Sequence, residues 1–407
     1  KMRKWILLLI WIGSTFSAVA QLDTKLYRSE TKIDSLDQGK WLVELDNITF
    51  FKDNEYAGRL QKGYTLPGFW LQPKLVYYPL SNVKLELGAH LLRYWGADRY
   101  PDGTYQGIAD LNSPTYQKGF HALPWLRAQV DLGNWSLVFG DIYGKSNHRL
   151  VDPLYSSELN LTADPEAGLQ VLYSSVHFDM DVWVDWQSFI FRDDTHQERF
   201  QVGFSSRFKW NSEDSPFHAY LPLQVMAQHR GGEIDTIHVN SVQTLMNGAA
   251  GLGFVWNTKK PVLRRVGAEA DLVFSYQQAG HLWPVESGTG YYLKAYTDLK
   301  DFRVKAAWWR NYSFVSLQGN PFYSCLSVDE PGTQFRSTGM FCLGLEYARN
   351  LGHGIILGAD ADIYLHKPFE KLVSGEGWEH KSFSNSFSIG AYLRVNPSIL
   401  IRHFGKE

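Results

Sequence analysis

Apolar and polar residues alternate in many short stretches of this chain of 407 residues. The stretch from Phe178 to Ile190 places apolar side chains at nearly every second position. Asp179, Asp181 and Asp185 occupy positions between them, which lie on the opposite face because successive side chains of a strand point to opposite sides. A period of two predicts strands that separate an apolar environment from a polar one.

Sixteen such stretches divide the chain, and the links between them are alternately short and long. The predicted strands are 38–52, 67–79, 82–96, 120–133, 134–146, 164–175, 177–192, 198–210, 217–230, 245–257, 263–278, 287–299, 302–315, 335–348, 353–366 and 380–396. The short links carry Gly, Asn, Asp, Ser or Pro, as tight hairpins require.

This rhythm predicts an all-β fold, namely a transmembrane antiparallel up-and-down β-barrel of about 16 strands, or roughly 14 to 18 if a strand has been split or merged. The alternative is a soluble sandwich, in which the apolar faces would pack against each other. In the barrel the apolar faces meet lipid, the short turns are periplasmic and the long loops are extracellular.

The first twenty residues have the features of a secretion signal. Lys1, Arg3 and Lys4 form a basic start, an apolar core follows, and Ala18 to Ala20 form a small-residue cleavage site. The apolar core is too short for a membrane helix, which needs about 20 residues. The expected divisions are a signal peptide at 1–20, a periplasmic lead at 21–37, the barrel at 38–396 and a tail at 397–407.

The amino-acid composition agrees with a barrel and does not indicate a nucleic-acid partner. Aromatic residues make up 15% of the chain, with 15 Trp and 22 Tyr, which suits the aromatic girdles at the two membrane interfaces. The mean hydropathy is −0.28, as expected where only every second strand residue meets lipid. The formal net charge is −2, so no basic excess indicates a nucleic-acid partner.

The polar faces of the predicted strands carry charges of both signs. Alternation assigns to the lumen Lys84, Glu86, Arg127, Asp131, Asp179, Asp181, Asp185, Arg199, Arg207, Lys209, Glu269, Asp271, Lys294, Arg303, Lys305, Glu346, Asp360, Asp362 and Arg394. Facing rows of opposite sign would create a transverse field that selects polar solutes in a pore. The alternative is a set of cross-strand ion pairs that satisfies a filled interior.

Other candidate sites are weaker. Trp183 and Gln187 share the inward face of one strand and could contact a sugar. Cys325 and Cys342 could form a disulfide, which an oxidising compartment permits, or remain free thiols. We find no motif for a metal, nucleotide or other cofactor. No nucleophile is placed beside a base, so we expect a protein that is not an enzyme, with an outer-membrane lipid hydrolase as the minor alternative.

The signal sequence, the alternating strands and the rhythm of short turns and long loops resemble Gram-negative outer-membrane porin-like β-barrels over residues 38–396. The resemblance implies the outer membrane, contact with lipid and lipopolysaccharide, and passive passage of small polar solutes such as sugars. The alternative function is a non-conducting barrel whose extracellular loops bind a glycan, a lipoprotein or a secretion or assembly partner. Porin-like barrels also suggest a homo-oligomer.

Overall fold

The computed structural model describes residues 22–57, 60–96, 120–189, 197–232, 242–330, 332–367, 369–373, 377–381 and 384–404. The strands are β1 (Lys40–Ala57), β2 (Lys62–Leu80), β3 (Val83–Tyr94), β4 (His121–Leu132), β5 (Trp135–Asp141), β6 (Ala167–Ser174), β7 (Phe178–Ser188), β8 (Arg199–Lys209), β9 (Phe217–Arg230), β10 (Gln243–Asn257), β11 (Leu263–Ala279), β12 (Ser287–Leu299), β13 (Phe302–Tyr312), β14 (Gln334–Phe335), β15 (Gly339–Gly352), β16 (Ile355–His366), β17 (Phe369–Val373), β18 (Gly377–Lys381), β19 (Ser384–Val395) and β20 (Ser398–His403). The predicted signal peptide at 1–20 lies outside these described residues.

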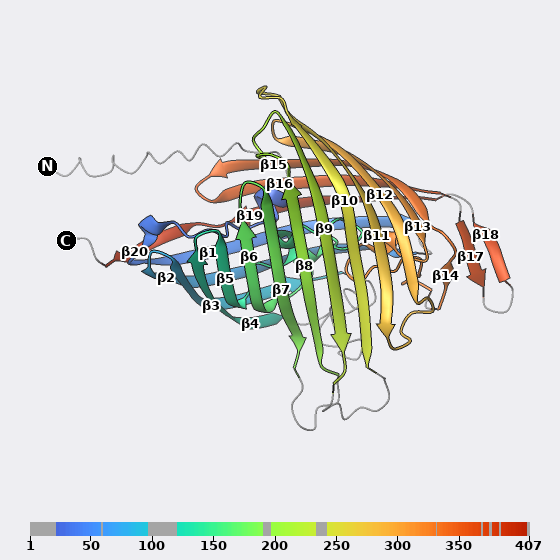
Figure 1. Ribbon diagram of the computed structural model, residues 1–407, viewed down its shortest axis with the longest axis horizontal. Helices are drawn as coiled ribbons and strands as arrows, with labels where there is room; N and C mark the ends of the chain where they lie inside the picture. The colour runs from blue at the N-terminus through green and yellow to red at the C-terminus, as the bar shows by residue number, and fades with distance from the viewer. Residues whose placement is uncertain are drawn as a thin grey trace.

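Antiparallel pairing joins each main strand to its neighbour in the chain and closes the sheet into a barrel (Figure 1). Strand β1 pairs with β2 on one edge and with both β19 and β20 on the other. The sheet holds 17 strands, and β20 continues the line of β19 along β1, so the ring has 16 positions in the described part of the chain. The predicted all-β, 16-stranded barrel is therefore confirmed.

Several strand boundaries differ from the sequence-based expectation by up to five residues, as at β1, which ends at Ala57 rather than 52, and three further differences change the architecture. Strand β5 ends at Asp141 rather than 146, because the chain there leaves the wall and turns into the lumen. Strands β14, β17 and β18 form a small separate sheet that alternation did not predict. The predicted tail at 397–407 was wrong in part, since residues 398–403 form β20 and extend the barrel wall.

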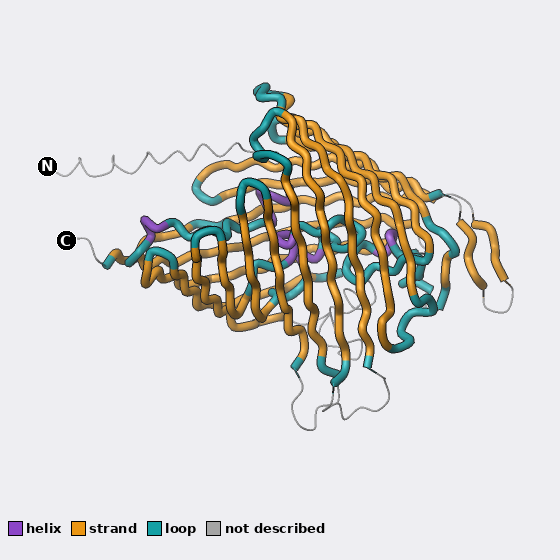
Figure 2. The backbone as a smooth tube through the Cα atoms, viewed as in Figure 1, coloured by secondary structure: helices purple, strands orange, loops and turns teal. Residues whose placement is uncertain are grey.

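Among the described residues, five short helical segments lie outside the strands (Figure 2). They are η1 (Asp23–Tyr27), η2 (Ser35–Asp37), η3 (Lys145–His148), α1 (Leu159–Thr162) and η4 (Pro321–Tyr323). Within the described ranges, none of the helices has the length and apolar character of a membrane span.

The outward face of the wall is apolar and the inward face is polar, as alternation requires. On β9, for example, Leu221 and Leu223 are 40% and 47% exposed, while Gln224 and Gln228 on the other face are buried. Apolar side chains stay exposed because the surrounding medium is hydrocarbon rather than water. The barrel exterior is therefore the lipid-facing surface.

Candidate active site

Among the described residues, three segments enter the barrel and occupy much of its lumen. They are the N-terminal segment (22–37), the β5–β6 loop (142–166) and the β13–β15 loop (313–338). The two loops meet inside the barrel, where Tyr155 and Gln318 form a β-bridge and the Ser316 hydroxyl donates to the Pro153 carbonyl at 2.6 Å. In Figure 2 these loops cross the middle of the barrel.

The part of the lumen toward the extracellular end contains an apolar core. Leu154 of the β5–β6 loop and Phe314 of the β13–β15 loop are fully buried, and they pack with inward side chains of the wall such as Trp309 and Met226. An apolar core of this kind excludes water, as the interior of a soluble domain does. The lumen is consequently packed at this level.

The N-terminal segment closes part of the periplasmic end of the barrel. Leu22 and Leu26 are buried against Ile356 and Tyr392 of the wall. The Arg394 guanidinium donates to the Leu26 carbonyl at 2.7 Å. The segment expected as a periplasmic lead thus begins inside the barrel mouth in its described part, because Leu22 and Leu26 find an apolar surface there.

His148 fastens the β5–β6 loop to the wall. Its Nδ1 lies 2.7 Å from Asp181 Oδ2 and its Nε2 lies 2.7 Å from Glu166 Oε2, and its ring stacks on Trp183 at 3.6 Å. Burial lowers the pKa of a histidine, but the Glu166 and Asp181 carboxylates outweigh it and raise the pKa of His148 to about 10. His148 is therefore a cation at neutral pH and is occupied as a clamp rather than available as a base.

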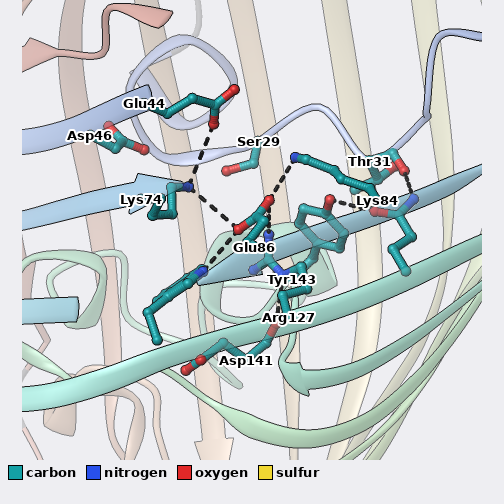
Figure 3. A network of polar contacts seen from close by, with 12 residues as sticks. Ser29, Thr31, Glu44, Asp46, Lys74, Lys84, Glu86, Arg127, Asp141 and Tyr143 are labelled. Atoms are coloured by element: carbon teal, nitrogen blue, oxygen red, sulfur yellow. Dashed lines mark hydrogen bonds and ion pairs between the residues drawn. The ribbon is translucent and has the colours of Figure 1, made fainter. Parts of the chain in front are cut away.

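Glu86 organises a second buried ionic cluster on β2 to β4 (Figure 3). Its carboxylate lies 2.6 Å from Lys84 Nζ, 3.6 Å from Lys74 Nζ and 3.5 Å from an Arg127 nitrogen, and it accepts a hydrogen bond from Trp125 Nε1 at 2.8 Å. The side chain of Glu86 is fully buried, so its charge is stabilised only by these partners.

The structure places the charged residues that alternation assigned to the lumen on the inward wall, where most of them pair with one another. The ion pairs include Asp179–Lys209, Glu269–Lys294, Glu346–Lys305, Asp362–Lys305, Asp360–Lys52, Arg394–Asp46 and Arg303–Asp298. Asp179 on β7 forms a cross-strand ion pair with Lys209 on β8, and Asp181 contacts His148 of the β5–β6 loop. These contacts agree with the alternative interpretation, in which the charges satisfy a filled interior.

Two smaller predictions do not agree with the structure. The proposed sugar contact at Trp183 is wrong, because its ring is fully buried beneath His148, and Gln187 beside it donates to Asp185. The proposed disulfide is also absent, since Cys325 and Cys342 are both buried free thiols. Each cysteine belongs to the apolar core of the lumen, where a thiol behaves as a small apolar group.

A cavity of about 410 Å³ remains between the N-terminal segment, the β5–β6 loop and the inner faces of β5 to β8. Its wall carries Arg28, Arg149 and Arg207 together with Asp179 and Asp181. The short β4–β5 and β6–β7 turns border it, so it lies at the periplasmic end.

A histidine–carboxylate pair lies at the other, extracellular end. His121 is the first residue of β4, and its Nδ1 lies 2.8 Å from Oδ1 of Asp164 at the end of the β5–β6 loop. The side chains of His121 and Asp164 are 10% and 27% exposed. His90 lies near them, and its Nε2 is buried without a hydrogen-bond partner in the described structure.

The β5–β6 loop holds Asp164 in place through its neighbours. The Lys145 ammonium donates to the Ala163 carbonyl, and the Lys145 amide donates to Glu166 Oε1 at 2.7 Å. Burial, partly offset by Asp164 and Glu166, lowers the pKa of Lys145 to about 8. Lys145 thus holds the chain on both sides of Asp164, through its ammonium group at Ala163 and its backbone amide at Glu166.

Sequence reasoning missed the His121–Asp164 pair. The two residues are 43 positions apart and neither belongs to a recognisable motif. They meet because β4 and β6 both pair with β5, which brings their extracellular ends together. Within the described residues, no three His, Cys, Asp or Glu side chains form a group suited to a metal ion.

A family model for proteins described as lipid A 3'-O-deacylase-type matches residues 33–404. The chain belongs to this family. The family is named for an enzyme, so the prediction that the protein is not an enzyme is wrong. A closed barrel with an apolar exterior in a family named for lipid A is a protein of the outer membrane, as expected.

Solved structures with a similar architecture are porin-like barrels. They include the outer membrane protein OprD from Pseudomonas aeruginosa (9% identity, TM-score 0.48, 93% of this chain and 100% of that one). Others are OccAB3 from Acinetobacter baumannii (10%, 0.47, 88% and 99%) and OccK1 from Pseudomonas aeruginosa (9%, 0.46, 89% and 99%). These likenesses are too distant to bear on activity. No curated protein matches the sequence significantly.

Proposed function

We propose that this protein is an outer-membrane esterase that removes an ester-linked acyl chain from lipid A, with His121 as general base and Asp164 as its orienting carboxylate. The observation that carries the proposal is the 2.8 Å contact between His121 Nδ1 and Asp164 Oδ1 at the extracellular end of the wall. Membership of the lipid A 3'-O-deacylase-type family supplies the substrate class.

The pair has the geometry that general base catalysis needs. A carboxylate on Nδ1 fixes the tautomer that carries a proton there and leaves the lone pair on Nε2. Nε2 then takes a proton from water, and the hydroxide attacks the ester carbonyl carbon. The bond from that carbon to the sugar oxygen breaks, and the imidazolium returns the proton to the leaving oxygen. The products are a free fatty acid and a sugar hydroxyl.

The pair lies at the level of the outer leaflet but on the lumenal side of the extracellular rim, so the ester of a lipid substrate has to reach it over the rim. Lipid A carries its ester groups at the boundary between headgroup and acyl chains, and His121 begins β4 directly after the extracellular connection. The packed lumen below prevents the substrate from passing inward. The β5–β6 loop thereby closes the barrel and also presents Asp164.

Another histidine at a comparable height offers a matched control. His229 near the end of β9 lies on the outward face, with its Nδ1 3.0 Å from Thr244 Oγ1. It has a hydroxyl partner but no carboxylate partner in the described structure. The proposal assigns His229 no part in the reaction.

The test is release of fatty acid from purified lipid A by the full-length protein in detergent micelles, measured by mass spectrometry. We expect His121→Asn and Asp164→Asn each to lower the rate about 10²–10⁴-fold, the usual contribution of a general base. His229→Asn should keep the wild-type rate. Absence of release by the folded wild type, or full activity of His121→Asn, contradicts the proposal.

Passive passage of small polar solutes is a second candidate function. The cavity of about 410 Å³ and the charges that line it favour this function at the periplasmic end. Passage would require the two lumenal loops to leave their apolar core. A steady single-channel current in planar bilayers supports this function, and a closed trace from protein that hydrolyses lipid A excludes it.

A further inference from the structure

The lipid-facing wall has a groove on the strands opposite the candidate active site. Its volume is about 400 Å³, within the usual size of a small-ligand site. Alanines occupy its floor where neighbouring outward positions carry Leu, Phe or Trp. The floor is Ala268, Ala270, Ala295 and Ala306, and the sides are Leu252, Phe254, Leu293, Trp308 and Phe341.

Strand register explains the shape of the groove. Ala268 pairs with Ala295, and Ala295 pairs with Ala306, so three small side chains form a row across β11, β12 and β13. One step towards the extracellular end, Leu293 pairs with Trp308 and forms a taller side. The row leaves a trough one side chain deep in an otherwise bulky surface, which suits a single acyl chain.

Two cations lie above the groove at its extracellular end. Arg310 follows Trp308 by two residues on the same outward face of β13, and Lys367 lies just beyond the end of β16. The Arg310 guanidinium lies 5.4 Å from the ring centre of Tyr312, and Lys367 Nζ lies 5.8 Å from that of Trp308. These aromatic rings hold both cations against the wall.

Gly339 brings the two cations together. It pairs with Arg310 across β13 and β15, and its carbonyl accepts a hydrogen bond from the Lys367 amide at 2.9 Å. A Cβ atom at Gly339 would lie 3.6 Å from the Cδ atoms of both Arg310 and Lys367. The aliphatic parts of the Arg310 and Lys367 side chains therefore border one small space, which is open because residue 339 is a glycine.

No carboxylate in the part of the chain that the structure describes neutralises either cation. Arg310 and Lys367 form no ion pair within the described residues, whereas the cations of the lumen are mostly paired. Outward charge on a barrel is tolerated only near an interface, where it meets anionic headgroups. The extracellular end of the wall faces the outer leaflet, whose phosphorylated lipid is lipopolysaccharide.

We infer that this wall binds one lipopolysaccharide molecule as a resident lipid, with a lipid A phosphate between Arg310 and Lys367 and one acyl chain along the alanine row. Strands β4 and β13 lie on opposite sides of the 16-position ring, so this lipid is not the molecule that His121 attacks. The inference therefore goes beyond the proposed esterase and does not depend on it.

The test is native mass spectrometry of the full-length protein in detergent, titrated with purified lipid A. The wild-type protein and His121→Asn are titrated in parallel, so the result does not depend on whether the protein hydrolyses the probe. We expect Arg310→Gln with Lys367→Gln to weaken binding at least about tenfold, since two charge-assisted contacts are lost. Ala295→Leu with Ala306→Leu, which fills the groove, should weaken it similarly.

A matched control lies on another part of the wall. Arg93 near the end of β3 lies over Trp95 at 5.3 Å, and it is not among the residues at the groove on β10 to β15. Arg93→Gln should bind lipid A as the parent does. Heat-modifiable mobility on gels confirms that each variant is folded.

Three outcomes overturn the inference. The first is unchanged lipid A binding by the folded Arg310 and Lys367 double variant. The second is equal binding of lipid A from which the phosphates have been removed. The third is equal binding of phosphatidylglycerol, which would make the groove a general anionic phospholipid site. Loss of hydrolysis in the esterase assay with retained lipid A binding separates the two proposals.

Discussion

Charged side chains on the two faces of the barrel wall have different kinds of partner. Inside, Glu86 is fully buried yet surrounded by three cations and an indole N–H. Outside, Arg310 and Lys367 have aromatic neighbours but no carboxylate partner among the described residues. Where the lumen is packed, as around Glu86, a charge must be neutralised by neighbouring side chains because burial removes it from water. An outward charge at the membrane boundary can find its partner in the surroundings, so it indicates a ligand more directly.

The largest effect on stability is expected from breaking the Glu86 cluster. Glu86→Ala would leave Lys84, Lys74 and Arg127 without their shared carboxylate, and loss of one partner of a buried ionic group costs about 3–5 kcal/mol. Urea unfolding followed by tryptophan fluorescence measures the change. The exposed Glu55 on the same wall is the control, and Glu55→Ala should change stability by less than about 0.5 kcal/mol. Equal effects of the two substitutions would contradict the ionic role of Glu86.

The apolar core of the lumen provides the next test. Leu154 is fully buried in the β5–β6 loop, and Leu154→Ala should cost about 2–5 kcal/mol as a core truncation does. Leu221, which is 40% exposed to lipid, supplies the comparison, and Leu221→Ala should cost clearly less. The same unfolding measurement applies. If both leucines gave the same loss, the lumen would not be packed as the structure shows.

His148 makes the attachment of the β5–β6 loop depend on pH. Its pKa is about 10 in the folded protein, above the unfolded value of about 6.5. The contribution of His148 to the free energy of unfolding is therefore complete below about pH 6.5, and it is lost as the pH rises towards 10. His148→Gln should remove about 1.5–3 kcal/mol at neutral pH, the value of hydrogen bonds to a charged group.

Unfolding free energies at pH 6, 8 and 10 check this prediction. The wild type should lose stability across that range by more than His148→Gln does. Parallel pH profiles of the two proteins would show that the imidazole is neutral in the folded state.

The smallest effect concerns the thiols. Burial raises the pKa of the Cys325 thiol to about 12, so the reactive thiolate is scarce at neutral pH. We expect maleimide to label Cys325 and Cys342 only after unfolding, and Cys325→Ser to change stability modestly. Rapid labelling of the folded protein, detected by mass spectrometry, would show that the lumen admits solvent at the core.

The architecture could be predicted from the sequence because it depends on a local rule. Alternation along β9 and β12 located both strands at their observed bounds, since each strand meets lipid on one face. The segment predicted as 134–146 was too long, because Ile142 and Tyr143 are apolar residues of a lumenal loop that continue the apparent pattern. Alternation cannot distinguish lipid from a packed lumen as the apolar environment.

The candidate site could not be predicted in the same way. His121 and Asp164 meet only through the pairing of β4, β5 and β6, and the Arg310 and Lys367 corner needs β13, β15 and the end of β16. Side-chain periodicity reports which face a residue occupies. It does not report which residue on another strand lies at the same height.

The sequence by itself determined a closed, lipid-facing barrel and the inward direction of its charged rows, because both follow from a period of two within each strand. Only the tertiary structure decided that the lumen is filled, that most of those charges are paired, and that a histidine and a carboxylate meet at the extracellular end. The physical reason is that the contacts of loops inside a barrel depend on packing and charge across the whole ring. The pattern of residues within one strand carries no information about these contacts.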